Sequence, residues 1–181
     1  MKRFWPVAVV VVILLAGGIF LALKPDHKSG SNQTQFAFKK ACSILTEARA
    51  KQLLGKDVTP DTSNQNAASG DLDVSSCGYA QQFSADAPAA TVKTALAAEI
   101  LVRAAKSDDG AQSNQLQFGL HKPATAQDVS GYGDRAYWYP SAAQLFILKH
   151  RNQYILSYGP IQGAHSLDQT KQLADLVIDD L

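Results

Sequence analysis

The pattern of apolar and polar residues divides the chain into three parts of different character. Residues 4–23 form an unbroken apolar run that follows Lys2 and Arg3. A helix of this length spans roughly 30 Å, the thickness of the hydrocarbon core of a bilayer. Residues 24–40 are polar and contain Pro, Gly and Ser, which predicts a tether. Residues 41–181 carry short apolar segments between turn residues, which predicts a single folded domain.

The apolar run predicts an uncleaved signal anchor, occupying residues 1–23, that crosses the cell membrane once. The apolar part of a cleaved signal peptide is shorter, about 7–15 residues, and ends at a small-residue cleavage site. This run closes on Leu23, Lys24 and Pro25, without a clear A-x-A pattern or a cysteine that could accept a lipid. Basic residues flank both ends, so charge favours an extracytoplasmic domain only weakly. The alternative is a signal peptide that is removed.

Within the domain, the pattern predicts helices towards the ends and strands between them. Residues 42–54 predict a short helix, which Thr46 caps and Gly55 ends. Residues 57–71 predict a turn-rich loop, residues 72–83 a strand and residues 108–120 a helix. Residues 90–105 are ambiguous, because their alanines favour helix while Val92, Leu96 and Ile100 also permit a strand. We predict a strand there.

The last third of the chain predicts a three-stranded meander followed by a helix. Its strands are expected at residues 129–139, 144–149 and 154–158, where aromatic and β-branched residues gather. Ser166 with Gln169 three positions later predicts a capping box for the final helix. The fold class is therefore α+β: an antiparallel sheet of about five strands with helices packed on one face, preceded by one transmembrane helix.

Charge and motif content exclude several classes of function. The chain has 17 basic and 16 acidic residues. Such a balance lacks the concentrated positive charge that nucleic acids require, so no nucleic-acid partner is expected. The four histidines lack metal-ligand spacing, and no glycine-rich phosphate loop or G-x-S-x-G motif occurs. We expect no metal, no cofactor and no catalytic residue.

Two cysteines, Cys42 and Cys77, both lie in the predicted domain. Two cysteines in an exported domain usually pair, which predicts one disulfide and an oxidising compartment. The alternative is a pair of reduced, buried thiols in a cytosolic domain.

The densest motif is SGYGDRAYW at residues 130–138, where charged and aromatic residues follow two glycines. A functional interpretation places a ligand groove here, formed by Tyr132, Asp134, Arg135, Tyr137, Trp138 and Tyr139. In the structural alternative, Gly131 and Gly133 adopt positive φ, Asp134 bonds to backbone amides, and the aromatic rings fill the core.

Aromatic residues are frequent throughout the meander, and strand alternation turns about half of them away from the main core. An exposed aromatic face would suit an envelope protein, a peptidoglycan fragment or another envelope polymer. The sequence therefore predicts a membrane-anchored extracytoplasmic binding or accessory domain that acts in the cell envelope. The alternative is a cell-envelope hydrolase or transferase that uses Asp134 with His121 or His165.

Two pairs of segments also carry a family resemblance: ACSILTEARAKQLLG with SSCGYA, and DVSGYGDRAYW with QLFILKHRNQYILSYG. Together they resemble the small extracytoplasmic domains of unknown function on secreted proteins and lipoproteins of Gram-positive bacteria. The resemblance rests on Cys42, Gly55, Cys77 with Tyr79, and Gly133 with Asp134 ahead of an aromatic strand. It implies a disulfide and an α+β fold, and it brings no reaction. This chain has an apolar run in place of the lipidated cysteine of the lipoproteins.

Overall fold

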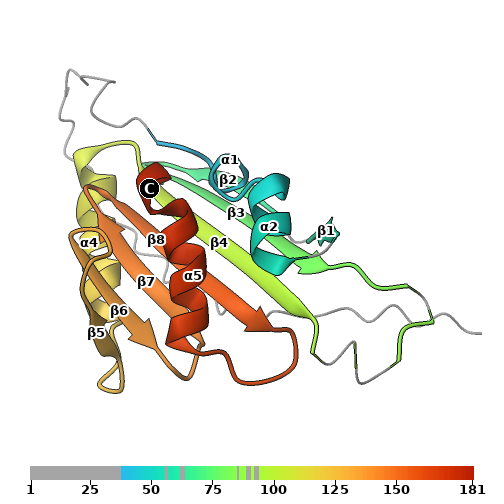
Figure 1. Ribbon diagram of the computed structural model, residues 1–181. Coiled ribbons are helices and arrows are strands. Elements are labelled where there is room, and N and C mark those ends of the chain that lie inside the picture. The colour runs from blue at the N-terminus through green and yellow to red at the C-terminus, as the bar shows by residue number, and fades with distance from the viewer. Residues whose placement is uncertain (1–37, 56, 62–63, 85, 89–90, 92–93) are drawn as a thin grey trace, which may run out of the picture. The chain divides into compact units, whose positions relative to one another are not determined.

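The computed structural model describes residues 38–55, 57–61, 64–84, 86–88, 91 and 94–181. The described residues belong to one compact unit, Ser31–Leu181. Figure 1 shows its elements, which are α1 (Ala41–Ile44), α2 (Glu47–Leu54), β1 (Val58–Pro60), β2 (Asn66–Ser69), β3 (Leu72–Gln81), β4 (Leu96–Ala105), α4 (Asp108–Leu120), β5 (Gln127–Val129), β6 (Arg135–Tyr139), β7 (Gln144–Lys149), β8 (Asn152–Pro160), α5 (Leu167–Val177) and the 3₁₀ turn η2 (Ile178–Asp180).

The strands form one antiparallel sheet in the order β1-β3-β4-β8-β7-β6-β5, and β2 also pairs with β3. The α+β class and the antiparallel sheet are confirmed. The expected number of about five strands is wrong, because the described chain contains eight. Residues 57–71, predicted as a loop, contain β1 and β2, which are short and mostly exposed and pair through their backbones. A pattern of apolar side chains does not reveal such strands.

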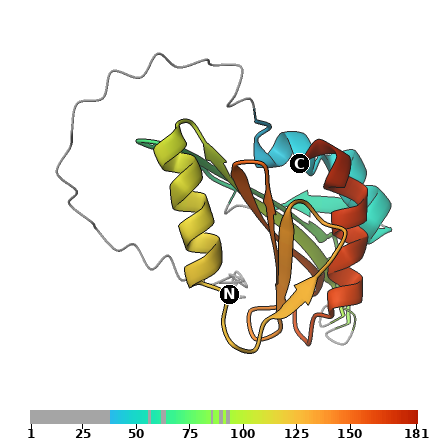
Figure 2. The ribbon, with the colours of Figure 1, turned by 90° about the vertical axis from the view of Figure 1, so that its left-hand side faces the viewer.

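Helices cover both faces of the sheet, which corrects the prediction of one covered face. On one face α1, α2 and α5 pack over a large core that contains Ile100, Leu145 and Leu156. On the other face α4 packs over a smaller cluster of Phe118, Tyr137, Phe146 and Leu148. Figure 2 shows α4 alone on its side of the sheet, opposite α5. Consecutive residues of β6 and β7 therefore enter different cores.

Local sequence signals account for the helix ends. The side chain of Thr46 accepts a hydrogen bond from the backbone N–H of Arg49, and Gly55 ends α2 with a φ of 67°. Ser166 and Gln169 form the predicted capping box at the start of α5. The predicted helix at residues 42–54 is interrupted, because α1 ends at Ile44 and α2 begins after Thr46. The ambiguous segment forms strand β4 from Leu96 onwards.

A disulfide joins Cys42 of α1 to Cys77 of β3, with 5.0 Å between their Cα atoms. The predicted pairing is therefore present, and the alternative of two reduced thiols does not hold in this structure. The bond fixes α1 to the sheet at a point where Cys77 is fully buried.

No helix in the described part of the chain is long and apolar enough to cross a bilayer. The predicted anchor, residues 1–23, and most of the predicted tether, residues 24–40, lie outside the described residues.

Candidate functional site

The loop between β5 and β6 carries the motif that the sequence analysis singled out. Gly131 and Gly133 have φ values of 88° and 62°. A Cβ added to Gly133 would lie 2.6 Å from the carbonyl oxygen of Leu148, so only glycine fits. The backbone N–H of Asp134 donates to that same oxygen at 2.8 Å. Its carboxylate accepts a hydrogen bond from the backbone N–H of His150 at 2.6 Å. These residues fix the loop to the β7–β8 hairpin.

The aromatic residues of the meander pack into the two cores. Tyr137 and Trp138 are 0% and 4% exposed, and they belong to opposite faces of the sheet. Tyr154 and Tyr158 are also buried, whereas Tyr132 and Tyr139 are half-buried. The described strands therefore do not present the broad aromatic face that alternation predicted, since α4 covers part of the second face.

Tyr132 links the motif loop to a helix on the far side of the molecule from α4. Its hydroxyl donates to the Asp175 carboxylate of α5 at 2.7 Å. Burial and this hydrogen bond raise the pKa of Tyr132 to about 12. The phenol is therefore neutral and positioned as a support for the loop.

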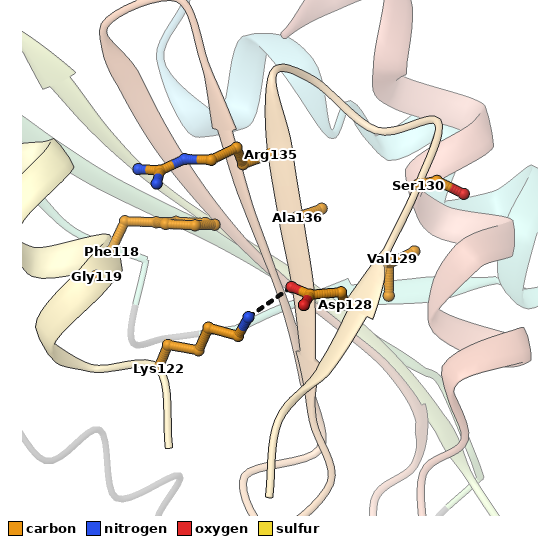
Figure 3. A pocket seen from close by; sticks show the side chains of 8 residues that line it. All are labelled: Phe118, Gly119, Lys122, Asp128, Val129, Ser130, Arg135 and Ala136. Carbon is orange, nitrogen blue, oxygen red and sulfur yellow. Dashed lines mark hydrogen bonds and ion pairs between the residues drawn. The ribbon is translucent and has the colours of Figure 1, made fainter. Parts of the chain in front are cut away.

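Among the six predicted site residues, Arg135 lines a pocket. This pocket lies between the C-terminal end of α4 and the β5–β6 hairpin, and its volume is about 350 Å³. Figure 3 shows its lining, which comprises Phe118, Gly119, Lys122, Asp128, Val129, Ser130, Arg135 and Ala136.

The guanidinium of Arg135 lies over the ring of Phe118, with 5.0 Å between its central carbon and the ring centroid. Phe118 in turn contacts Tyr137 at 4.8 Å between centroids, and Tyr137 stacks on Phe146 at 4.7 Å. The cation thus lies on a rigid aromatic support, a cation–π arrangement that holds its planar group in place. Arg135 forms no ion pair with any described carboxylate.

Lys122 supplies a second cation to the same pocket, and its Nζ lies 2.6 Å from Oδ1 of Asp128. Both side chains project into the space below Arg135 (Figure 3). The pocket therefore has two cationic side chains and one carboxylate on the face of the sheet that carries Phe118, whereas the side chains of Val129 and Ala136 belong to the core on the opposite face. This set matches a ligand with one negative charge.

The histidines of the enzymatic alternative have other contacts. Among the hydrogen bonds of the described residues, none joins Asp134 to His121 or His165. His165 Nε2 lies 2.7 Å from the carbonyl oxygen of Pro160, and Nδ1 lies 3.3 Å from Ser157 Oγ. Since a carbonyl only accepts, Nε2 carries the proton and Nδ1 accepts from the serine. The ring also packs on Gly159, so this pair fixes the segment that leads from β8 into α5.

The described residues contain no group of three or more His, Cys, Asp or Glu side chains arranged to hold a metal ion. Comparison of the chain with protein-family models, with curated proteins and with solved structures finds no match.

Sequence reasoning identified Arg135 but missed its neighbours in the pocket. Phe118 comes from the last turn of α4, Lys122 follows the end of that helix by two residues, and Asp128 comes from β5. Their meeting depends on α4 crossing the second face of the sheet, which the prediction left without a helix. The one local signal was the placement of opposite charges at Lys122 and Asp128 on either side of a short turn.

Proposed function

We propose that this chain is a membrane-anchored extracytoplasmic binding domain whose α4–β6 pocket holds an acidic group of a cell-envelope polymer or protein. The observation that carries this proposal is Arg135: its guanidinium is supported by Phe118, has no described carboxylate partner, and borders a pocket. An arginine in this state is ready to bind an anion, because its fork of donors is already oriented.

The location outside the cytoplasm is supported by two features of the chain. The apolar run at residues 4–23 has the length of a membrane-spanning helix. The disulfide between Cys42 and Cys77 is typical of proteins in oxidising compartments.

The chemistry of the pocket favours a carboxylate or a phosphate on a small unit. Arg135 offers two parallel N–H donors, and Lys122 offers a second positive charge. Asp128 already neutralises part of this charge, so the pocket favours one negative charge over several. Phe118 is the apolar side chain that borders the pocket on the same side as these charges. Lactyl and peptide carboxylates of peptidoglycan fragments and phosphodiesters of envelope polymers have this character.

The test is calorimetric titration of the full chain in detergent micelles with soluble muramyl peptides and with glycerol-phosphate oligomers. Arg135→Gln is expected to weaken binding about tenfold or more, and Arg135→Lys nearly as much, because lysine lacks the planar fork. Lys106→Gln is the matched control, since it removes one exposed positive charge outside the pocket and is expected to leave affinity unchanged. Equal binding by Arg135→Gln and the parent would overturn the assignment of the pocket.

A further inference from the structure

A second cavity lies beside the turn between β7 and β8 and has no part in the proposed function. Its walls come from residues 38–39 ahead of α1, from Ala105, from residues 150–152 with Tyr154, and from residues 179–181. We call it the hairpin pocket. Its volume is about 580 Å³, against about 350 Å³ for the α4–β6 pocket. Small-molecule sites usually measure about 300–1,000 Å³, so a small organic ligand fits in this space.

Side-chain contacts link the walls of the hairpin pocket to one another. Lys39 and Arg49 both pair with Asp180, which joins the segment ahead of α1 to the turn η2. The Nζ of Lys149 donates to the carbonyl oxygen of Ile178 at 2.9 Å, which joins the hairpin to the same turn. A ligand therefore meets a site whose walls are already positioned, and binding costs less ordering of the chain.

The cationic side chains of the hairpin pocket already have carboxylate partners. Lys39 pairs with Asp180, and Arg151 pairs with Asp108. An anionic ligand would have to compete with these carboxylates for the same donors. The hairpin pocket therefore differs from the α4–β6 pocket, and its charges do not favour an acidic ligand.

A hydroxyl group and a carboxylate in the hairpin pocket have bonding capacity that the described residues do not use. Tyr154 is 3% exposed, and its hydroxyl oxygen accepts from Asn152 Nδ2 at 3.4 Å, while the hydroxyl donates to no described residue. Burial raises the pKa of Tyr154, so the hydroxyl keeps its proton at neutral pH. The exposed carboxylate of Asp179 forms no ion pair or hydrogen bond with a described residue. The pocket thus offers one buried donor and one acceptor.

This combination matches the hydroxyl groups of a neutral sugar. The Tyr154 hydroxyl has a hydrogen to donate, and the Asp179 carboxylate can only accept. A sugar hydroxyl both donates and accepts, so neighbouring hydroxyls of one ring can satisfy both groups. The half-buried ring of Phe38 lines the same pocket and offers an apolar surface to the C–H face of a sugar. A zwitterion such as an amino acid would also need a cation for its carboxylate, and the lining cations are already paired.

We infer that the hairpin pocket binds a neutral saccharide of one or two rings. The Tyr154 hydroxyl donates to one sugar hydroxyl, the Asp179 carboxylate accepts from another, and Phe38 packs against the ring. This site is separate from the α4–β6 pocket and takes an uncharged ligand, so the two assignments stand or fall independently.

The test is a titration of the isotope-labelled full chain with cellobiose and with N,N′-diacetylchitobiose, followed by NMR of the backbone amides in micelles of a detergent without sugar head groups. Amides of residues 150–154 and 179–181 are expected to shift as sugar is added, and those of residues 128–136 to stay in place. Glycylglycine, a zwitterion, is expected to cause no shift. The inference is overturned if neither sugar shifts the pocket amides, or if glycylglycine shifts them and the sugars do not.

Variants of the two polar groups test their roles. Tyr154→Phe and Asp179→Ala are each expected to weaken sugar binding about fivefold or more, because each removes a hydrogen-bonding group. The matched controls are Tyr158→Phe, whose hydroxyl donates to the Leu53 carbonyl outside the pocket, and Asp86→Ala, an exposed carboxylate outside it. Both controls are expected to bind as the parent does. Far-ultraviolet circular dichroism confirms that all four variants fold, and parental affinity in either pocket variant would contradict the inference.

The variant Arg135→Gln separates this site from the one in the proposed function. It is expected to leave sugar binding unchanged, since Arg135 does not line the hairpin pocket. If Arg135→Gln weakened sugar binding as much as Tyr154→Phe does, the sugar would lie in the α4–β6 pocket and the assignment to the hairpin pocket would be wrong.

Discussion

The carboxylate of Asp134 accepts a hydrogen bond from the backbone N–H of His150 at 2.6 Å. His150 has a φ of 57°, in the left-handed region that residues other than glycine rarely adopt. Asp134 thus holds the tight β7–β8 turn in an unusual conformation from a neighbouring loop. Asp134, which the enzymatic alternative named as a catalytic residue, therefore stabilises a turn.

Replacing Asp134 with alanine is expected to lower the free energy of unfolding by about 1–2 kcal/mol, because the His150 N–H loses a charged acceptor. Urea denaturation followed by tryptophan fluorescence measures the change. Asp134→Asn keeps an acceptor oxygen and is expected to lose less than half as much. Equal losses in the two variants would mean that the charge, and not the hydrogen bond, matters.

Gly133 and Gly131 offer a matched pair of substitutions in one loop. Both have positive φ, but a Cβ on Gly133 would meet Leu148 at 2.6 Å, whereas Gly131 faces open space. Gly131→Ala is expected to cost about 1 kcal/mol of stability through backbone strain alone. Gly133→Ala is expected to cost at least about 3 kcal/mol, since the strand pairing must also shift. Thermal unfolding of both proteins checks this order.

Tyr137 is fully buried, and its hydroxyl has no hydrogen-bond partner. Tyr137→Phe removes an unsatisfied polar group and keeps the ring stack with Phe118 and Phe146. We expect the variant to be as stable as the parent at pH 7 or more stable by about 1 kcal/mol. Tyr158→Phe is the control, and it is expected to be destabilising, because that hydroxyl donates to the Leu53 carbonyl.

The same residue predicts a dependence on alkaline pH. Burial raises the pKa of Tyr137 to about 12 from an ordinary value of 10.0. The unfolded chain therefore ionises this phenol first, and the parent loses stability as the pH rises from 10 towards 12. Tyr137→Phe is expected to lose less over that range. If the free energies of unfolding of the parent and the variant changed equally between pH 10 and pH 12, Tyr137 would not be the source of this dependence.

Glu99 predicts a dependence of the same sign at acid and neutral pH. Burial raises the pKa of its carboxyl above the ordinary value of 4.5, and the negative charge of Asp61 adds to the effect. Since the folded state prefers the proton, stability falls as the pH rises from 4.5 through the folded pKa and stays lower above it. Glu99→Gln is expected to be more stable than the parent at pH 7, with the gain vanishing near pH 3. A gain in stability that does not change with pH would show that it does not come from the ionisation of Glu99.

The parts of the fold that follow from local chemistry were predictable. Thr46, Gly55 and the Ser166–Gln169 pair mark helix ends through hydrogen bonds that span only a few residues. The strands β1 and β2 were not, because they have few buried side chains and are held by pairing with β3. The pocket was predictable only at Arg135. The wall that faces Arg135 comes from α4, whose position on the sheet depends on Asn114 and Gly110, and a periodic pattern of apolar residues does not predict those contacts.

The disulfide between Cys42 and Cys77 has a mechanical consequence. Force applied to the chain ahead of residue 41 enters the domain at α1 and passes, through the covalent bond, straight into β3. Strand β3 is hydrogen-bonded to neighbouring strands on both of its edges, so the force is distributed over many backbone hydrogen bonds. In an oxidised molecule this force bypasses the residues between Cys42 and Cys77, whereas in a reduced molecule they would unfold first from this end.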